Sequence, residues 1–197
     1  MKKIITALSF AISLTLMVTL CGCLGDKKSN ESKSSSSNGM NIISYAKDGK
    51  IPEIPFALGE NVETLKSKYK DTVESGSEVD DLTVDEGEKT VWLDGGSVVF
   101  CYTKANADKG ISAVVAKEYA YNFSMGGVST PEDVIAAVDS KDYTRQAATE
   151  NEVFFLPTVP ENCECIKYIA GENELRFIFI DGYLSAVTLI NPALWAQ

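Results

Sequence analysis

The chain has 197 residues, of which 45% are hydrophobic, and its 28 acidic and 18 basic residues give a formal net charge of −10. Because nucleic-acid binding depends on Lys and Arg that neutralise phosphates, this charge argues against nucleic acid as a partner. The chain contains no histidine, which removes the Ser-His-Asp and Cys-His arrangements of nucleophilic enzymes and the commonest transition-metal ligand.

The first 22 residues have the layout of a secretory signal peptide. Lys2 and Lys3 form a basic start, and Ile4–Leu20 is apolar apart from a few Ser and Thr. A charged start followed by an apolar run predicts a cleaved signal peptide over residues 1–22. The apolar run is somewhat long, so a retained membrane helix is the alternative interpretation.

The tetrapeptide LCGC at residues 20–23 resembles the bacterial lipobox, in which a small residue directly precedes the cysteine that takes a diacylglyceryl group. The resemblance implies cleavage between Gly22 and Cys23 and lipid attachment at Cys23. Cys21 fits the pattern worse, because Leu20 would directly precede it. Each buried methylene contributes about 0.8 kcal/mol, and two acyl chains anchor a protein stably. We therefore expect a chain held by its lipid on the extracytoplasmic face of a bacterial membrane.

Residues 23–40 follow the predicted cleavage site. After the cysteine they consist mainly of Ser, Lys, Asn and Gly, with almost no apolar side chains. Such a segment buries too little surface to order itself, and a flexible chain of this length typically spans about 21–25 Å. The composition predicts a tether between the lipidated cysteine and a folded domain.

Residues 41–197 are enough for one domain with a single core. Two parts of this segment, about 50–118 and 119–191, share short sequences in the same order. The tripeptide SAV, for example, occurs at 112–114 and again at 185–187. We interpret these parts as two tandem repeats, each with a first strand, a helix and a run of antiparallel strands.

Both predicted helices have start signals. Asn61 can cap a helix whose apolar stripe begins with Val62 and Leu65. In the second repeat, Thr130 suits the N-cap position and Pro131 suits the first helical position. The sequence therefore predicts one helix after each of these caps.

Glycine-containing turns separate the predicted strands. Asp94-Gly95-Gly96 and Asp181-Gly182 supply the positive φ that tight hairpins need. Val153–Leu156 is predicted as an additional strand that ends at Pro157. The whole domain is therefore predicted to be α+β, with one antiparallel sheet.

The segments FALG at 56–59 and FSMG at 123–126 each lead into a predicted helix and a three-strand meander. This arrangement resembles the tandem-repeat fold of beta-lactamase inhibitor protein and of the related small outer-membrane assembly lipoproteins. The resemblance implies that the two repeats form one sheet with helices on one face and an open opposite face. The resemblance implies a common fold and not a common activity.

The alternation of side chains assigns the two faces of the sheet. The helix-facing positions are predicted to be large and apolar in both repeats: Val98, Phe100, Tyr102, Leu175, Phe177 and Phe179. The alternate positions are mixed, as expected of a half-exposed face: Val99, Cys101, Thr103, Arg176, Ile178 and Ile180. Trp92 is predicted on this open face beside Arg176, and Trp and Arg are enriched in binding hot spots. The alternative interpretation is that Trp92 covers the edge of the core.

Three cysteines, Cys101, Cys163 and Cys165, lie in the predicted domain. Outside the cytosol, Cys101 could form a disulfide with either of the other two, or all three could stay reduced. Cys163 and Cys165 would share one face of a strand, but two thiols make a weak zinc site.

Glu74–Glu88 contains seven acidic residues. Its oxygen-rich side chains could bind calcium, but the ordered ligand spacing of a calcium loop is missing, which favours a solvated loop. We expect no metal and no cofactor.

These patterns favour a non-catalytic lipoprotein that binds a protein or a cell-wall component. One alternative is a small hydrolase that uses paired carboxylates. The other is a ligand-capturing lipoprotein for a transporter, although such proteins usually need two lobes and this domain is short for that.

Overall fold

The computed structural model describes residues 41–69, 97–117, 123 and 125–195, together with the backbone of residues 78–80 and 88–93. The predicted signal peptide, Cys23, the tether and the turn at residues 94–96 lie outside the described residues. Most of the acidic segment Glu74–Glu88 does as well. Among the helices that are described, none has the length and apolar character needed to span a membrane.

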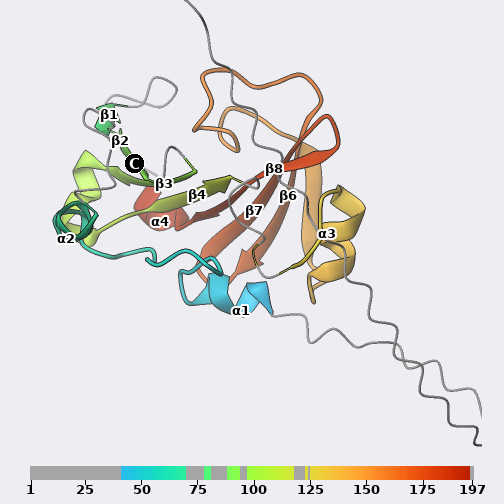
Figure 1. Ribbon diagram of the computed structural model, residues 1–197, viewed down its shortest axis with the longest axis horizontal. Helices are drawn as coiled ribbons and strands as arrows, with labels where there is room; N and C mark the ends of the chain where they lie inside the picture. The colour runs from blue at the N-terminus through green and yellow to red at the C-terminus, as the bar shows by residue number, and fades with distance from the viewer. Residues whose placement is uncertain are drawn as a thin grey trace, which may run out of the picture. The chain divides into compact units, whose positions relative to one another are not determined.

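The domain contains helices and one large antiparallel sheet (Figure 1). The helices are α1 (Ile42–Lys47), α2 (Val62–Lys68), the 3-10 helix η2 (Lys104–Lys109), α3 (Pro131–Ala137) and α4 (Pro192–Trp195). The strands are β1 (Glu78–Asp80), β2 (Glu88–Leu93), β3 (Val98–Thr103), β4 (Ala113–Lys117), β5 (Tyr143–Ala147), β6 (Cys163–Ala170), β7 (Asn173–Ile180) and β8 (Tyr183–Ile190). The predicted α+β class is confirmed.

The strands lie in the order β1-β2-β3-β4-β8-β7-β6-β5, and every neighbouring pair is antiparallel. In chain order, α2 precedes β1–β4 and α3 precedes β5–β8. Four described strands therefore follow the helix of each block, one more than the predicted three-strand meander. The blocks meet where β4 pairs with β8 in the middle of the sheet.

Local signals act as predicted at both helix starts and at one hairpin. The Thr130 hydroxyl accepts a hydrogen bond from the Asp133 N–H at 3.2 Å, and Pro131 occupies the first helical position of α3. The Asn61 side chain accepts a hydrogen bond from the Thr64 N–H at 2.9 Å and so caps α2. Asp181 and Gly182 join β7 to β8 with φ values of 52° and 81°, as a type I′ turn requires.

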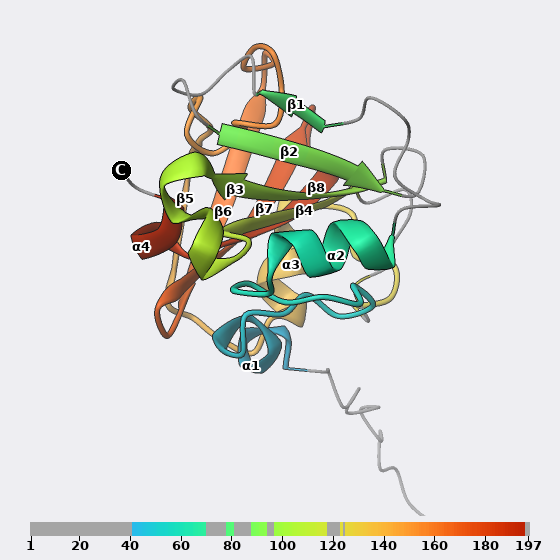
Figure 2. The same cartoon turned by 90° about the vertical axis from the view of Figure 1, so that its left-hand side faces the viewer.

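One face of the sheet packs against α1, α2 and α3, which Figure 2 shows on the same side of the strands. The predicted helix-facing residues lie in this core, and Phe100, Leu175 and Phe177 are fully buried. Tyr168 packs edge-on against Phe177 with their ring centroids 5.9 Å apart. The prediction for this face is confirmed.

The opposite face is covered, and the prediction of an open face is wrong. Val99, Cys101 and Ile178 are completely buried in a second apolar cluster. Its cover is the segment 148–160, which supplies Val153 and Phe154. Trp195 of α4 packs at a tilt against Phe154, with 4.6 Å between the ring centroids. We call the segment 148–160 the strap.

The strap is built from turns and bends, so the strand predicted at Val153–Leu156 is also wrong. Its run of apolar residues buries side chains against the sheet without joining it as a strand. The alternation of side chains along a strand predicts which residues share a face of the sheet. It does not show whether a distant segment of the chain folds over the face with mixed residues.

Candidate functional site

Trp92 and Arg176, the predicted binding pair, are far apart in the sheet. Trp92 pairs with Val99 of β3, and the same cross-strand row continues through β4 and β8 to Arg176 of β7. Four strand spacings of about 4.8 Å place their backbones about 19 Å apart. The Trp92 side chain lies outside the described residues, so its exposure stays a prediction.

Arg176 is buried beneath the strap, with 8% of its surface exposed. Its Nε and Nη2 donate to the Glu174 Oε2 at 3.0 and 2.5 Å, and its Nη1 donates to the Asn151 carbonyl oxygen at 2.8 Å. Lys167 Nζ lies 3.6 Å from the other Glu174 oxygen. Arg176 therefore ties the strap to the sheet and is not available on an open binding face.

The three cysteines of the domain are buried thiols, and none of them is in a disulfide. Cys101 lies on β3 and the other two lie on β6, with β4, β8 and β7 between them. Four strand spacings of about 4.8 Å separate these strands by about 19 Å, whereas disulfide formation needs Cα atoms within about 7 Å. This fold therefore does not allow a disulfide from Cys101 to Cys163 or Cys165.

Cys163 and Cys165 lie on one face of β6, opposite Ile180 and Ile178 of β7. Burial raises the pKa of the Cys165 thiol to about 12, and it also raises the pKa of Cys163. Both thiols therefore stay protonated at neutral pH. Because nucleophilic attack and metal binding need the thiolate form, neither cysteine is activated for these roles. Within the described part of the chain, no group of three His, Cys, Asp or Glu side chains could hold a metal ion.

The buried Cys165 thiol makes stability depend on pH above 9. Its pKa is about 12 when folded but near its ordinary value of 9.0 when unfolded. Its contribution to the free energy of unfolding is complete below pH 9 and is lost as the pH rises from 9 to 12, because the unfolded state then binds fewer protons. We expect the wild type to lose stability faster than Cys165→Ala in this range, by up to about 1.4 kcal/mol per pH unit.

Urea denaturation of both proteins at about pH 8, 9 and 10 measures this difference in slope. The Cys165→Ala variant is the control, because Lys and Tyr residues titrate in the same range in both proteins. Equal slopes for the two proteins would contradict the buried-thiol assignment.

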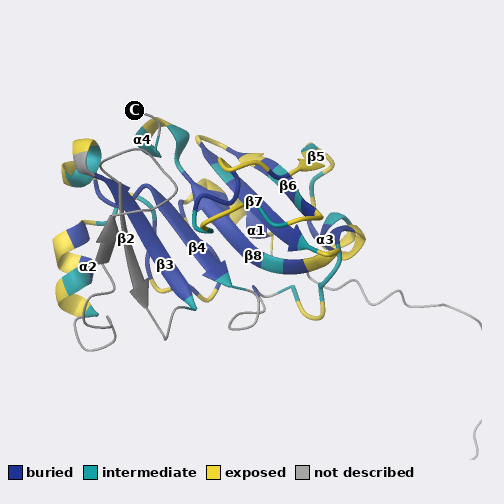
Figure 3. Cartoon of the chain, turned by 90° about the horizontal axis from the view of Figure 1, so that it is seen from above, coloured by how far each residue is buried: buried dark blue, intermediate teal, exposed yellow. Residues whose placement is uncertain are grey.

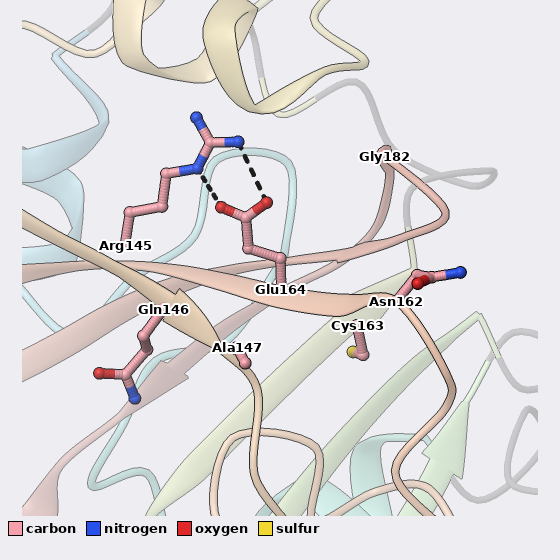
Figure 4. Close-up of a pocket in the computed structure, with 7 residues that line it drawn as sticks. All are labelled: Arg145, Gln146, Ala147, Asn162, Cys163, Glu164 and Gly182. Atoms are coloured by element: carbon pink, nitrogen blue, oxygen red, sulfur yellow. Dashed lines mark hydrogen bonds and ion pairs between the residues drawn. The ribbon is translucent and has the colours of Figure 1, made fainter.

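A hollow of about 610 Å³ lies where β5 ends and β6 begins, at one edge of the sheet. We call it the edge hollow. It is lined by Arg145, Gln146, Ala147, Asn162, Cys163, Glu164 and Gly182. Figure 4 shows Arg145 and Glu164 on one side of the strands, and Gln146 and Cys163 on the other. The edge hollow therefore wraps around the sheet edge.

Arg145 is the centre of a charge cluster beside the edge hollow. Its Nη2 donates to the Glu164 Oε2 at 3.1 Å and its Nε donates to the Glu164 Oε1, while its Nη1 donates to the Glu132 Oε1 at 2.8 Å. Hydrogen bonding to the two carboxylates raises the pKa of Arg145, and the hydrogen bond from Arg145 lowers the pKa of Glu132. These charges hold α3, β5 and β6 together and leave one carboxylate in excess.

No pattern in the sequence marks Arg145, Glu132 and Glu164 as a cluster. The chain contains two arginines, Arg145 and Arg176, and only the second was singled out. Because arginine is so scarce in this chain, both arginines could have been selected from the sequence as candidate functional residues. The carboxylates that surround Arg145 come from α3 and β6 and lie 13 and 19 residues away in the sequence, so spacing does not reveal them.

A second hollow, of about 420 Å³, lies between the end of α1 and the β6–β7 hairpin. Asn173 lines it, and its Nδ2 donates to the Ala46 carbonyl oxygen at 2.8 Å, which joins the hairpin to α1. The Asn173 Oδ1 is buried and has no hydrogen-bond partner among the residues that the structure describes. The charged residues that line this hollow, Lys47, Asp48 and Glu172, are exposed.

Comparison with known proteins gives one distant structural similarity to report. No family model matches the sequence, and no curated protein matches it. The crystal structure of a DUF4309 family protein (YjgB) from Bacillus subtilis subsp. subtilis str. 168 aligns with a TM-score of 0.49 and 19% sequence identity. The alignment covers 77% of this chain and 93% of that one.

Proposed function

We propose that this chain is a lipid-anchored extracytoplasmic lipoprotein whose domain is a non-catalytic binding module for a protein or a cell-wall component. The observation that carries the anchor is the LCGC tetrapeptide at residues 20–23, which follows a basic start and an apolar run. Cys23 would carry the lipid, and residues 23–40 would let the domain move above the membrane surface.

The chemistry of the described residues supports binding over catalysis. The chain has no imidazole, and the pKa values of Cys163 and Cys165 are raised. The pKa of Glu132 is lowered, which is the opposite of what a carboxylic acid needs to donate a proton at neutral pH. The hydrolase alternative therefore has little support at the edge hollow. The transporter-linked alternative calls for two lobes, whereas β1–β8 belong to one sheet.

We also infer that the two helix-plus-strand blocks are copies of one unit. The SAV tripeptides at residues 112–114 and 185–187 fall at the start of β4 and within β8. These are the last strands of the two blocks, and they pair with each other. The inference predicts that the β1–β4 and β5–β8 blocks superimpose in an experimental structure.

The anchor is tested by a matched pair of cysteine substitutions. In a bacterial host, we expect the wild type and Cys21→Ala to enter the detergent phase and to begin at a diacylglyceryl Cys23. Cys23→Ala removes the sulfur that takes the lipid, so it should carry no lipid and retain the leader.

Detergent phase separation and intact-mass spectrometry of the N-terminal peptide measure both properties. Lipid on Cys23→Ala, or its loss in Cys21→Ala, would contradict the assignment to Cys23. An unmodified wild type that keeps residues 1–22 would favour the retained membrane helix.

A further inference from the structure

We propose that the outer edge of β5 binds an extended, basic segment of a partner protein as an additional strand. One cationic side chain of that segment would enter the edge hollow. This inference deepens the proposed binding role and rests on it, but it does not depend on the lipid anchor. Its evidence is the backbone geometry of β5, the exposure of its residues and the charges around the edge hollow.

The backbone of β5 presents unused hydrogen-bonding groups. β5 is the last strand in the sheet order and pairs with β6 in a regular antiparallel register. The Ala148 N–H donates to the Cys163 carbonyl oxygen at 2.9 Å just beyond the strand. Because hydrogen-bonded and non-hydrogen-bonded pairs alternate along an antiparallel ladder, Thr144 and Gln146 also bond to β6. The N–H and C=O groups of Tyr143, Arg145 and Ala147 therefore point outward.

These outward groups are accessible within the described structure. Thr144, Arg145, Gln146 and Ala147 are all exposed, and β5 appears largely in the exposed colour at the sheet edge in Figure 3. No other described hydrogen bond uses the backbone N–H of Tyr143, Arg145 or Ala147. Tyr143, Arg145 and Ala147, which alternate with the two residues bonded to β6, supply the hydrogen-bonding pattern that strand addition requires.

The usual protection of an edge strand is missing from β5. Edges are normally protected by proline, a bulge, or a charged side chain directed at an incoming strand. β5 contains no proline and its register with β6 has no irregularity. Its one charged side chain, Arg145, bonds to Glu164 and Glu132 over the helix-covered side of the sheet. A partner strand would therefore meet no unpaired charge at this edge.

The charges around the edge hollow select the partner. The Arg145 guanidinium bonds to the carboxylates of Glu132 and Glu164. A third carboxylate, that of Asp181, accepts a hydrogen bond at 3.1 Å from the side chain of Asn162, which lines the edge hollow. The whole chain is also acidic, with a net charge of −10. A basic segment is attracted by this surface, whereas an acidic one is repelled.

The same charges disfavour a second copy of the chain as the occupant. If β5 paired antiparallel with β5 of another copy through the three outward residues, the two clusters of Arg145, Glu132 and Glu164, each with one carboxylate in excess, would face each other across the strand pair. Like charges directly opposite each other destabilise a strand pair, and two acidic chains repel each other. The partner is therefore a different protein with Lys or Arg in an extended segment.

Amide hydrogen exchange tests the edge in the full-length protein in detergent. In the free protein, we expect fast exchange at the Tyr143, Arg145 and Ala147 amides and slow exchange at Thr144 and Gln146. A synthetic octapeptide of alternating Lys and Val should slow exchange at the three outward amides. Two control peptides replace Lys by Glu or carry N-methyl groups on every backbone nitrogen, and neither should do so.

Two substitutions at one position provide the protein control. Ala147→Pro removes an outward N–H but no bond to β6, whereas Ala147→Val keeps that N–H. We expect Ala147→Pro to bind the Lys–Val peptide roughly five- to tenfold more weakly than Ala147→Val does. Equal binding by both variants would overturn the proposal, as would equal binding of a control peptide or protection at other amides. None of these results depends on whether Cys23 carries lipid.

Discussion

The Arg176→Met substitution is expected to lower the free energy of unfolding by about 2–3 kcal/mol. Methionine keeps the apolar stem of the side chain but removes the guanidinium that bonds to Glu174 and to the Asn151 carbonyl oxygen. Breaking a buried ion pair typically costs about 3–5 kcal/mol because it leaves an uncompensated charge. The expected value is lower because Lys167 remains close to Glu174.

Arg145→Met is the matched control for this prediction. The Arg145 side chain is 41% exposed, compared with 10% for Arg176, and exposed ion pairs are screened by water and salt. Its substitution should therefore change stability much less. Urea denaturation followed by tryptophan fluorescence measures both variants, since Trp195 contacts the strap residue Phe154. Equal effects of the two substitutions would contradict the role of Arg176 in holding the strap.

The Gly110→Ala substitution is expected to have the largest effect, a loss of at least about 3 kcal/mol. Gly110 has a φ of 92°, and a Cβ atom there would lie 2.4 Å from the Gly59 carbonyl oxygen and 2.5 Å from that of Glu60. The two segments cannot move apart freely. The Gly59 N–H donates to the Ile111 carbonyl oxygen at 2.8 Å, and the Ile111 N–H donates to the Glu60 carbonyl oxygen at 3.0 Å.

Gly182→Ala separates the backbone strain from this clash. Gly182 has a φ of 81°, and a Cβ atom there would meet no atom of the described residues within 4 Å. The cost at this turn is then the left-handed conformation alone, about 1–2 kcal/mol. Chemical denaturation of both variants gives the difference, and soluble yield serves as the measure if Gly110→Ala does not fold. Similar losses in both variants would show that the segments carrying Gly59 and Gly110 separate at little cost.

The amino-acid sequence by itself determined the features that depend on neighbouring residues. Thr130 and Pro131 start α3 because a hydroxyl cap and a proline suit these positions regardless of what packs nearby. Asp181-Gly182 makes a two-residue turn because its backbone can adopt positive φ. The apolar residues Phe100 and Phe177 mark the helix-covered face, since side chains alternate along a strand.

Only the tertiary structure decided the state of the other face and the place of the charges. The strap covers that face because Val153 and Phe154 bury apolar surface there, and this contact joins segments that no local pattern relates. It converts Arg176 from a predicted binding residue into a buried contact. The strand order separates Cys101 from Cys163 and leaves β5 at an edge beside acidic side chains. Strand order depends on which strands pair across the whole sheet, so sequence spacing does not contain it.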